Sequence, residues 1–263
     1  MLLFGIFGNP VAHSISPRLH NAVLNAFDIE GCYGRFLISQ PSFLLPTFHE
    51  LGFSGVNVTV PHKEQAFNSC DEVRGIAQKI GAVNTLVKEG TKVIGYNTDA
   101  EGFFHSLSSF GKVNSALIIG AGGTAKAIAT ILKEHGMEVC ILNRSPERLV
   151  FFENNGFTCK TWESFEPSAY ELIINTTSAG LKDETLPCPE VLLDLLLRQA
   201  SFAVDVIYNK PTPFLQKASS FGLTCKDGKE MLLYQAVLAF NLFFKNKYEP
   251  KKIESIMREI FDL

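Results

Sequence analysis

The sequence predicts an α/β fold made of two parts, each a β-sheet with helices packed against it. Short apolar segments alternate with helical patterns from the first residues onward, an order typical of parallel sheets whose strands are joined by helices. A glycine-rich turn, Gly120–Thr124, stands between an apolar run and a helical pattern, so a second strand–helix series begins near residue 114. The length of 263 residues suits one large domain or two modest ones.

Composition and charge argue against several classes of partner. The chain is 46% hydrophobic and 19% charged, as in ordinary globular proteins. Its net charge of −3 gives no reason to expect binding to nucleic acid or to an anionic membrane surface. The six cysteines show no metal-ligand spacing, and the N-terminus lacks the features of a signal peptide. We therefore expect a cytoplasmic protein with free thiols, no bound metal and no membrane span.

The first part is expected to begin with a strand over 2–7 and a helix over 18–27. Ser16 is placed to be the N-cap of this helix, and Pro17 suits its first turn. Ser14 has no such structural explanation. Two hydroxyls two residues apart, among the free N–H groups of a helix N-terminus, can bind a carboxylate.

The third strand leads to a candidate catalytic lysine. A strand over 33–38 and a helix over 41–51 precede it, and residues 55–60 alternate apolar and polar side chains. This alternation predicts a strand with one buried face, which Pro61 ends because it has no N–H to donate. Lys63 then lies just past a strand end, where scaffolds present functional groups. The alternative is a solvated lysine at a strand end.

Two more polar candidates follow in the first part. A helix over 64–80 leads to a strand over 81–87, in which Asn84 interrupts an apolar run and needs hydrogen-bond partners. The chain then turns back, and Asp99 lies where the returning strand meets a helix over 100–110. Asp99 is either the N-cap of that helix or a functional carboxylate.

The second part has the pattern of a dinucleotide-binding unit. An apolar strand over 115–119 leads into the glycine turn, a helix over 126–135 and a strand over 137–142. Glycines at such a turn allow a tight bend and a close approach of the backbone to a pyrophosphate at the helix N-terminus. Strand, turn, helix and strand together predict a Rossmann-type unit.

The residues after the second strand of this unit favour NADP over NAD. NAD sites usually carry Asp or Glu there, whereas this strand ends in Asn143–Arg148. Arg144 and Arg148 can meet the ribose 2′-phosphate of NADP, and the alternative is a pair of solvated arginines at a helix start.

Two further loops are candidates to bind the cofactor. Strands over 170–174 and 203–206 end in the polar loops 175–180 and 207–213, and ligands of open α/β sheets bind beyond such strand ends. The chain closes with a last strand and two helices that we expect to pack partly on the first part, over 223–225, 231–245 and 251–261.

The same short motifs occur, in the same order, in one enzyme family. They are Ser14–Pro17, Asn57–Lys63, Gly81–Thr85, Gly95–Asp99, Gly120–Thr124, Asn143–Ser145, Asn175–Ser178, Asp205–Tyr208, Met231–Leu232 and Gln235. On these motifs the chain resembles the shikimate dehydrogenases over essentially its whole length. The resemblance implies a two-domain α/β protein with a cleft between its domains: a substrate domain formed by 1–101 and 236–263, and a Rossmann-type NADP domain formed by 102–235.

The resemblance also implies roles for individual residues. Lys63 and Asp99 would be the catalytic pair, and Ser14 and Ser16 would bind the substrate carboxylate. The ring hydroxyls would be surrounded by the catalytic pair together with Thr59, Asn84 and Gln235, with Tyr208 nearby. NADP would be bound by Gly120, Ala121, Gly122, Gly123, Thr124, Asn143, Arg144, Ser145, Arg148, Val206 and Gly228.

One motif departs from the family pattern. The family usually reads Gly-x-Gly-Met-Leu near the last strand, whereas this chain reads Gly228-Lys229-Glu230-Met231-Leu232. Glu230 lacks the backbone freedom of a glycine.

The activity implied is the reversible NADPH-dependent reduction of 3-dehydroshikimate to shikimate, in the pathway to chorismate and the aromatic amino acids. The Lys63 ammonium would stabilise the charge that forms on the carbonyl oxygen and supply the proton, while Asp99 holds the ammonium in place. A quinate/shikimate dehydrogenase of broader specificity and a non-catalytic ligand sensor are the alternatives. The expected partner is the small-molecule substrate, and the chain is expected to be a monomer or a homodimer.

Overall fold

The computed structural model of the protein describes residues 1–166, 168–208 and 210–261. The chain forms two compact units, which divide after Gly102 and after Met231. The first unit contains the N-terminal segment and the chain from Leu232 onward, and the second contains Phe103–Met231. The resemblance to the family implies divisions after residue 101 and after residue 235. The described part of the chain contains no helix with the length and apolar character needed to cross a membrane.

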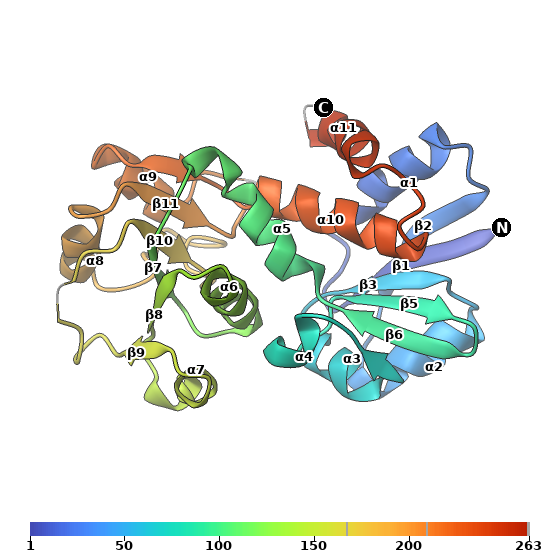
Figure 1. The fold of residues 1–263 in the computed structure, drawn as a ribbon, viewed down its shortest axis with the longest axis horizontal. Helices are drawn as coiled ribbons and strands as arrows, with labels where there is room; N and C mark the ends of the chain where they lie inside the picture. The colour runs from blue at the N-terminus through green and yellow to red at the C-terminus, as the bar shows by residue number, and fades with distance from the viewer. Residues whose placement is uncertain (167, 209, 262–263) are drawn as a thin grey trace. The chain divides into compact units, whose positions relative to one another are not determined.

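The first unit is built on a mixed sheet with the strand order β2-β1-β3-β5-β6-β4 (Figure 1). Strands β1, β2 and β3 are parallel, as the alternation of strands and helices predicts. Strand β5 runs antiparallel to both β3 and β6, and a tight turn joins β5 directly to β6. The strands are β1 (Leu2–Gly8), β2 (Gly31–Leu37), β3 (Gly55–Val58), β4 (Glu72–Val73), β5 (Thr85–Glu89) and β6 (Lys92–Tyr96).

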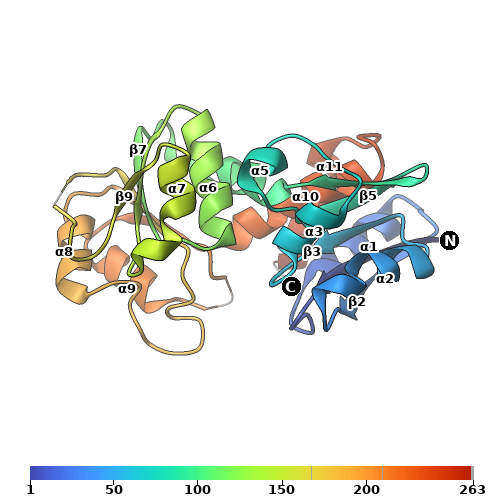
Figure 2. The ribbon, with the colours of Figure 1, turned by 90° about the horizontal axis from the view of Figure 1, so that it is seen from below.

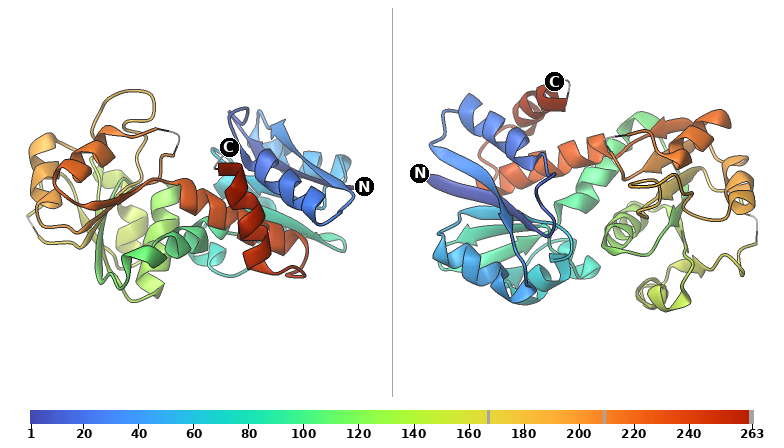
Figure 3. Two further views of the ribbon diagram at one scale, coloured as in Figure 1. Left: turned by 90° about the horizontal axis from the view of Figure 1, so that it is seen from above. Right: turned by 180° about the vertical axis from the view of Figure 1, so that it is seen from behind.

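Helices cover both faces of this sheet. On one face α1, α10 and α11 bury a cluster that includes Phe4, Val23 and Phe240, and Figure 3 shows these helices beside one another. On the other face Phe48 of α2 and Ala66 of α3 belong to a second cluster. The helices of this unit are α1 (Ser16–Ala26), α2 (Leu44–Glu50), α3 (Lys63–Ser69), α4 (Ala77–Ile80), α5 (Thr98–Ser106), α10 (Lys229–Phe243) and α11 (Pro250–Phe261), of which α5 and α10 continue across the divisions between the units.

Strand β3 is shorter and more deeply buried than the sequence pattern predicts. It ends at Val58, and all four of its residues are buried, including Asn57, which is 3% exposed. The prediction of one buried face is wrong, because helices pack on both faces of the sheet.

Two helix predictions in this unit are also wrong in their extent. The helix predicted over 64–80 ends at Ser69, and the chain then forms β4 against the open edge of β6 before α4 begins. This edge supplies backbone hydrogen bonds that a continuous helix would forgo. The helix predicted over 41–51 consists of a 3₁₀ turn, Pro41–Phe43, followed by α2.

The second unit is a parallel sheet with the strand order β12-β11-β10-β7-β8-β9. All neighbouring strands in it are parallel, and the order reverses at β7, which is the doubly wound Rossmann arrangement. The predicted Rossmann-type unit is therefore confirmed. The strands are β7 (Ser115–Ile119), β8 (Glu138–Leu142), β9 (Thr158–Lys160), β10 (Leu172–Asn175), β11 (Phe202–Asp205) and β12 (Thr224–Lys226).

Helices again cover both faces of the second sheet. Figure 2 shows α6 and α7 on one face and α8 and α9 on the other. Leu193 of α8 and Phe214 of α9 pack with Leu117 and Ile173 of the sheet in a single core cluster. The helices are α6 (Gly123–Glu134), α7 (Val150–Asn154), α8 (Glu190–Leu197) and α9 (Pro213–Ser220).

Candidate active site

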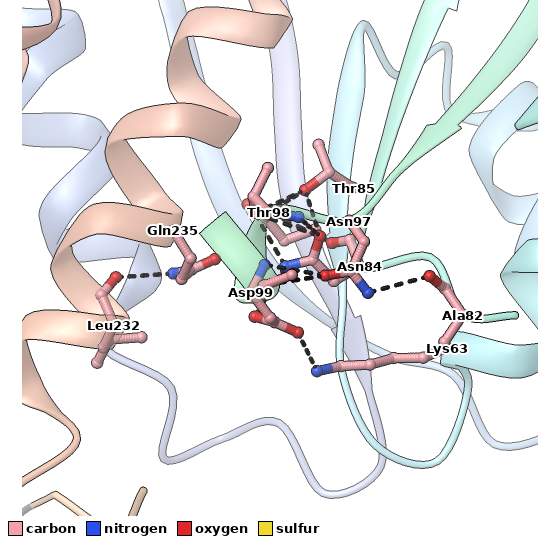
Figure 4. Close-up of polar contacts among 11 residues, drawn as sticks. Lys63, Ala82, Asn84, Thr85, Asn97, Thr98, Asp99, Leu232 and Gln235 are labelled. Carbon is pink, nitrogen blue, oxygen red and sulfur yellow. Dashed lines mark hydrogen bonds and ion pairs between the residues drawn. The ribbon is translucent and has the colours of Figure 1, made fainter. Parts of the chain in front are cut away.

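Lys63 and Asp99 form an ion pair in the first unit (Figure 4). Lys63 is the first residue of α3, Asp99 lies in the first turn of α5, and the Lys63 Nζ is 2.5 Å from Asp99 Oδ2. The two side chains are 20% and 13% exposed, so solvent and salt screen this pair less than a surface pair. The alternative of a solvated Lys63 is therefore wrong in this structure.

Asn84 binds the other oxygen of the same carboxylate. Its Oδ1 accepts a hydrogen bond from the backbone N–H of Thr98 at 2.7 Å, and this donor fixes the orientation of the amide. The Asn84 Nδ2 then donates to Asp99 Oδ1 and to Thr98 Oγ1, each at 2.9 Å. Asp99 is thus held by a cation on one oxygen and by an amide on the other.

The N-terminus of α5 is capped by Asn97, a residue to which we assigned no role from the sequence. The Asn97 Oδ1 accepts from the backbone N–H groups of Asp99 and Ala100, at 3.1 and 3.2 Å. The suggestion that Asp99 caps this helix is therefore wrong. Because Asn97 satisfies those N–H groups, the Asp99 carboxylate is available for Lys63.

Ser14 and Ser16 lie together at the start of α1. Their hydroxyl oxygens are 3.2 Å apart, both residues are buried, and Ser14 Oγ accepts from the Ser16 N–H at 3.3 Å. The prediction that Ser16 is the N-cap is wrong: α1 begins at Ser16, Ile15 holds the cap position, and no side chain caps the helix. Arg35 Nε donates to the Ser14 carbonyl at 2.8 Å and so holds the loop.

Gln235 and Thr59 both lie in the first unit, on different elements. Gln235 lies on α10, is buried, and donates through Nε2 to the Leu232 carbonyl at 2.9 Å; Figure 4 shows it beside Asp99. A Cβ added at Gly102 of α5 would lie 2.7 Å from the Gln235 nitrogen, so the glycine permits this close approach. Thr59 follows β3, and its N–H donates to the Phe7 carbonyl at 2.8 Å.

The glycine turn of the second unit has the geometry of an anion-binding site. Gly120 has a φ of +109°, and a Cβ there would lie 2.6 Å from Thr176 Oγ1. Apart from the adjoining residues and the backbone of the helix itself, no heavy atom of the described residues lies within 4 Å of a Cβ added at Gly122 or Gly123. No side chain among the described residues caps α6. The first N–H groups of a helix have no partner within the helix, so this open N-terminus fits a pyrophosphate.

The segment after β8 carries two cations. The Asn143 Nδ2 donates to the Ser145 carbonyl at 2.9 Å and thereby closes a local turn. Arg144 and Arg148 are exposed, the latter at the end of the 3₁₀ turn Pro146–Arg148. This arrangement leaves both guanidinium groups accessible to a phosphate.

A buried carboxylate organises the loops at the ends of β10 and β11. Asp205 accepts hydrogen bonds from Asn175 Nδ2 at 3.0 Å, Thr212 Oγ1 at 2.7 Å and the Ile207 N–H at 3.0 Å. Burial raises the pKa of Asp205, and these hydrogen bonds act in the opposite direction. Tyr208 follows in a partly buried position, where burial raises its pKa. Asn209 of the same loop lies outside the described residues.

The departure at Lys229-Glu230 does not strain the chain. Helix α10 begins at Lys229, whose N–H donates to Asp227 Oδ1 at 3.0 Å, so Glu230 adopts a helical conformation that needs no glycine. Its Oε2 pairs with Lys226 Nζ at 2.7 Å. Gly228 does need to be glycine, because a Cβ there would lie 2.2 Å from the carbonyl oxygen of Val206.

A lysine–carboxylate pair in one unit, together with a glycine turn that opens a Rossmann-type sheet in the other, defines the class of nicotinamide-dependent dehydrogenases. Residues 6–86 match the family model described as the shikimate dehydrogenase substrate binding domain. The NADP(+) shikimate dehydrogenase of Helicobacter hepaticus is 49% identical over 264 residues, which cover 98% of each chain. That of Helicobacter pylori strain 26695 is 45% identical over 264 residues, again with 98% of each chain covered.

Solved structures give the same assignment. The crystal structure of the Thermus thermophilus shikimate 5-dehydrogenase in complex with NADP(H) and shikimate matches with a TM-score of 0.86 and 36% identity. That match covers 98% of this chain and 99% of the other. The chain therefore belongs to the shikimate dehydrogenase family, as its motifs predict.

Proposed function

We propose that this protein catalyses the reversible, NADPH-dependent reduction of 3-dehydroshikimate to shikimate, a step toward chorismate and the aromatic amino acids. The observation that carries the proposal is the partly buried ion pair in which Lys63 Nζ is 2.5 Å from Asp99 Oδ2. Membership of the family supports the choice of substrate and cofactor.

Lys63 has the chemistry that carbonyl reduction requires. As the carbonyl carbon gains a hydride, negative charge develops on its oxygen, and a proton must reach that oxygen. The Lys63 ammonium can stabilise the charge because it is a cation, and it can donate the proton because it carries three N–H groups on a flexible side chain. In the oxidative direction the reverse holds: the neutral Lys63 amine accepts the hydroxyl proton as the hydride leaves, and so becomes the ammonium. Asp99 keeps the cation in place, and Asn84 keeps Asp99 in place.

The binding residues are assigned by the chemistry that they offer. Ser14 and Ser16 offer hydroxyl donors to the substrate carboxylate, while Thr59, Asn84, Gln235 and Tyr208 are assigned to the ring hydroxyls. NADPH, when bound, would supply the hydride from its reduced nicotinamide. Its pyrophosphate is assigned to the turn from Gly120 to Thr124 and its 2′-phosphate side to Asn143, Arg144, Ser145 and Arg148. Val206 and Gly228 are assigned to the cofactor as further binding residues.

The setting that we propose is a cytoplasmic monomer or homodimer that acts on a small molecule and not on nucleic acid. All six cysteines are free thiols, which suits a reducing compartment. Light scattering of the purified protein distinguishes the monomer from the dimer.

A turnover assay with the purified protein tests the function. Shikimate and quinate are each offered with NADP⁺ and with NAD⁺, and formation of the reduced nicotinamide is followed. We expect the highest kcat/KM with shikimate and NADP⁺. Comparable values for quinate would support the broader quinate/shikimate dehydrogenase, and absence of turnover in all four combinations would support a ligand sensor.

Arg144→Ala tests the assignment of the 2′-phosphate. We expect KM for NADP⁺ to rise about 10- to 100-fold, since a charge-assisted hydrogen bond to phosphate is lost, while KM for NAD⁺ stays near the parent value. Arg198→Ala, an exposed arginine at the end of α8, is the matched control. Equal losses with both cofactors would contradict the assignment.

A further inference from the structure

Arg35 of β2 is bonded to the loop that carries Ser14 and Ser16. The Arg35 Nε donates to the Ser14 carbonyl oxygen at 2.8 Å, and the loop is closed by the Ser14 N–H, which donates to the Val11 carbonyl at 3.1 Å. The carbonyl that Arg35 binds and a hydroxyl assigned to the substrate carboxylate therefore belong to the same residue. Arg35 thus holds the main chain at the point where that hydroxyl is presented.

The part of β2 that carries Arg35 is itself held in place. Two residues earlier, Asn21 of α1 accepts from the Tyr33 N–H at 2.8 Å and donates to the Tyr33 carbonyl at 2.9 Å. The Tyr33 ring stacks on His20 with the ring centres 4.3 Å apart, and its Oη donates to Asn57 Oδ1 at 2.8 Å. These contacts give Arg35 a fixed base from which to reach the loop.

The positive charge of Arg35 has no acidic partner in the part of the chain that the structure describes. Nε is the only guanidinium nitrogen of Arg35 that bonds to a described residue, and no described carboxylate lies within 4.0 Å of the guanidinium. Lys63, by contrast, is paired with Asp99. Of these two cations, only Arg35 keeps an uncompensated charge.

A carboxylate at this loop gains from a nearby cation. Ser14 and Ser16 are 8% and 4% exposed, so a carboxylate bound to their hydroxyls leaves much of its water behind, and a buried anion is costly unless a positive charge compensates it. The whole chain has a net charge of −3 and offers no general attraction to an anion. The attraction therefore has to come from a local cation.

Arg35 is close enough to act on such a carboxylate. The hydrogen bond to the Ser14 carbonyl, the length of one serine and a hydrogen bond from its hydroxyl place the guanidinium within about 10 Å of the carboxylate. This is about one Debye length at 0.1 M salt, so the two charges still attract each other. Because Arg35 is exposed, solvent and salt weaken this attraction, and its size depends on the ionic strength.

We infer that Arg35 is a positioning residue that also sets the specificity of the carboxylate subsite: its Nε holds the Ser14 main chain, and its charge makes the subsite prefer an anion to a neutral group. We assigned no role to Arg35 from the sequence. The inference deepens the proposed function and rests on it.

Arg35→Gln tests the inference, because glutamine can still donate an N–H but carries no charge. At low salt we expect KM for shikimate to rise about three- to tenfold, with kcat within about twofold and KM for NADP⁺ near the parent value. Added salt should reduce the difference between variant and parent, since it screens the attraction that only the parent has. Arg35→Lys keeps the charge and should restore most of the lost affinity.

The methyl ester of shikimate separates the effect of charge from a general structural effect. The parent should prefer shikimate to its ester, and Arg35→Gln should reduce that preference about three- to tenfold. Arg18→Gln is the matched control, since it removes the same charge from an exposed position on α1, two residues after Ser16, and should leave the preference near the parent value. Thermal melts in circular dichroism check that the variants are folded.

Three results would overturn the inference. They are equal losses with acid and ester in Arg35→Gln, an equal effect of Arg18→Gln, and a loss in Arg35→Lys as large as that in Arg35→Gln. The parent protein provides a test that needs no variant: its KM for shikimate should rise with added salt more than its KM for the ester. Equal salt dependence for both compounds would contradict the inference.

Calorimetry keeps the two hypotheses apart. Absence of turnover in the parent protein refutes the proposed function, whereas shikimate affinity measured by calorimetry still tests Arg35. An affinity about three- to tenfold weaker in Arg35→Gln supports the inference, and an equal affinity contradicts it.

Discussion

Asp99 is bound by side chains from two separate places in the first unit, Lys63 at the start of α3 and Asn84 just before β5. Each carboxylate oxygen has one of these partners, so the carboxylate has little freedom to turn. The ammonium of Lys63 is in turn kept at one position. Charge stabilisation in a dehydrogenase depends on such fixed placement, since a preorganised cation needs no rearrangement during the reaction.

Lys63→Ala removes the cation and the proton donor together. We expect kcat to fall by roughly two or more powers of ten, with KM for shikimate less affected, because the lost interaction is strongest in the transition state. Steady-state kinetics in both directions measure this. Lys88→Ala, an exposed lysine on β5, is the control. Near-normal turnover in Lys63→Ala would remove this residue from the mechanism.

His20 gives the first unit a pH-dependent stability. It is 1% exposed, neither ring nitrogen has a hydrogen-bond partner among the described residues, and burial lowers its pKa from 6.5 to about 3. At a pH between the ordinary pKa and the lowered pKa of His20, the unfolded chain binds a proton that the folded unit does not. The free energy of unfolding therefore falls as the pH falls, by up to about 1.4 kcal/mol per pH unit.

His20→Phe keeps an aromatic ring against Tyr33 and removes the titrating group. We expect the free energy of unfolding of this variant to depend less on pH than that of the parent, over the range just below the ordinary pKa of histidine. Urea denaturation at several pH values, followed by circular dichroism, measures the difference. The same slope in both proteins would show that His20 does not cause it.

Among the elements, the site depends on how closely helices and strands approach one another. Helix α5 carries Asp99 in its first turn and Gly102 one turn later, and α10 passes over that glycine with Gln235. In the second unit Gly228 allows the chain before α10 to pass against the carbonyl of Val206. Both glycines serve close backbone packing, and neither has a positive φ.

Gly102→Ala is expected to push α10 away from α5, because the new Cβ would lie 2.7 Å from the backbone nitrogen of Gln235. The variant should lose about 1–3 kcal/mol of stability, as overpacked sites do, and KM for shikimate should rise as Gln235 moves. Thermal denaturation and steady-state kinetics test the two effects. Unchanged values of both would mean that the helices accommodate the methyl group freely.

Across the full length of the protein, the chain leaves its first unit and later returns to it. Phe4 of β1 stacks on Phe243 of α10 with ring centres 5.1 Å apart, so segments near the two ends of the chain share one core. The second unit has a separate core beneath α8 and α9. The residues assigned to the substrate lie in the first unit apart from Tyr208, and those assigned to NADP lie in the second.

Elements with local signals could be predicted from the amino-acid sequence. The glycine turn, the apolar strands around it and the order of strands and helices predicted the Rossmann-type unit, and the short motifs predicted the family. Such signals extend over a few residues, so they can be read without knowledge of the packing. Strand β3 shows the limit: its alternation of apolar and polar residues predicted one buried face, although helices cover both.

Which polar groups meet one another could not be predicted in this way and depends on the packing of the folded chain. The capping of α5 by Asn97 and the hydrogen bonds of Asn57 with Tyr33 and Thr85 are of this kind. The pairing of Lys63 with Asp99 was implied by the family resemblance alone, and the structure shows the contact. Asn57 offered one signal in the sequence, a polar residue in a buried strand, because such a side chain must find partners. Which partners it finds depends on register and helix packing, and these are set by contacts between segments that are distant in the sequence.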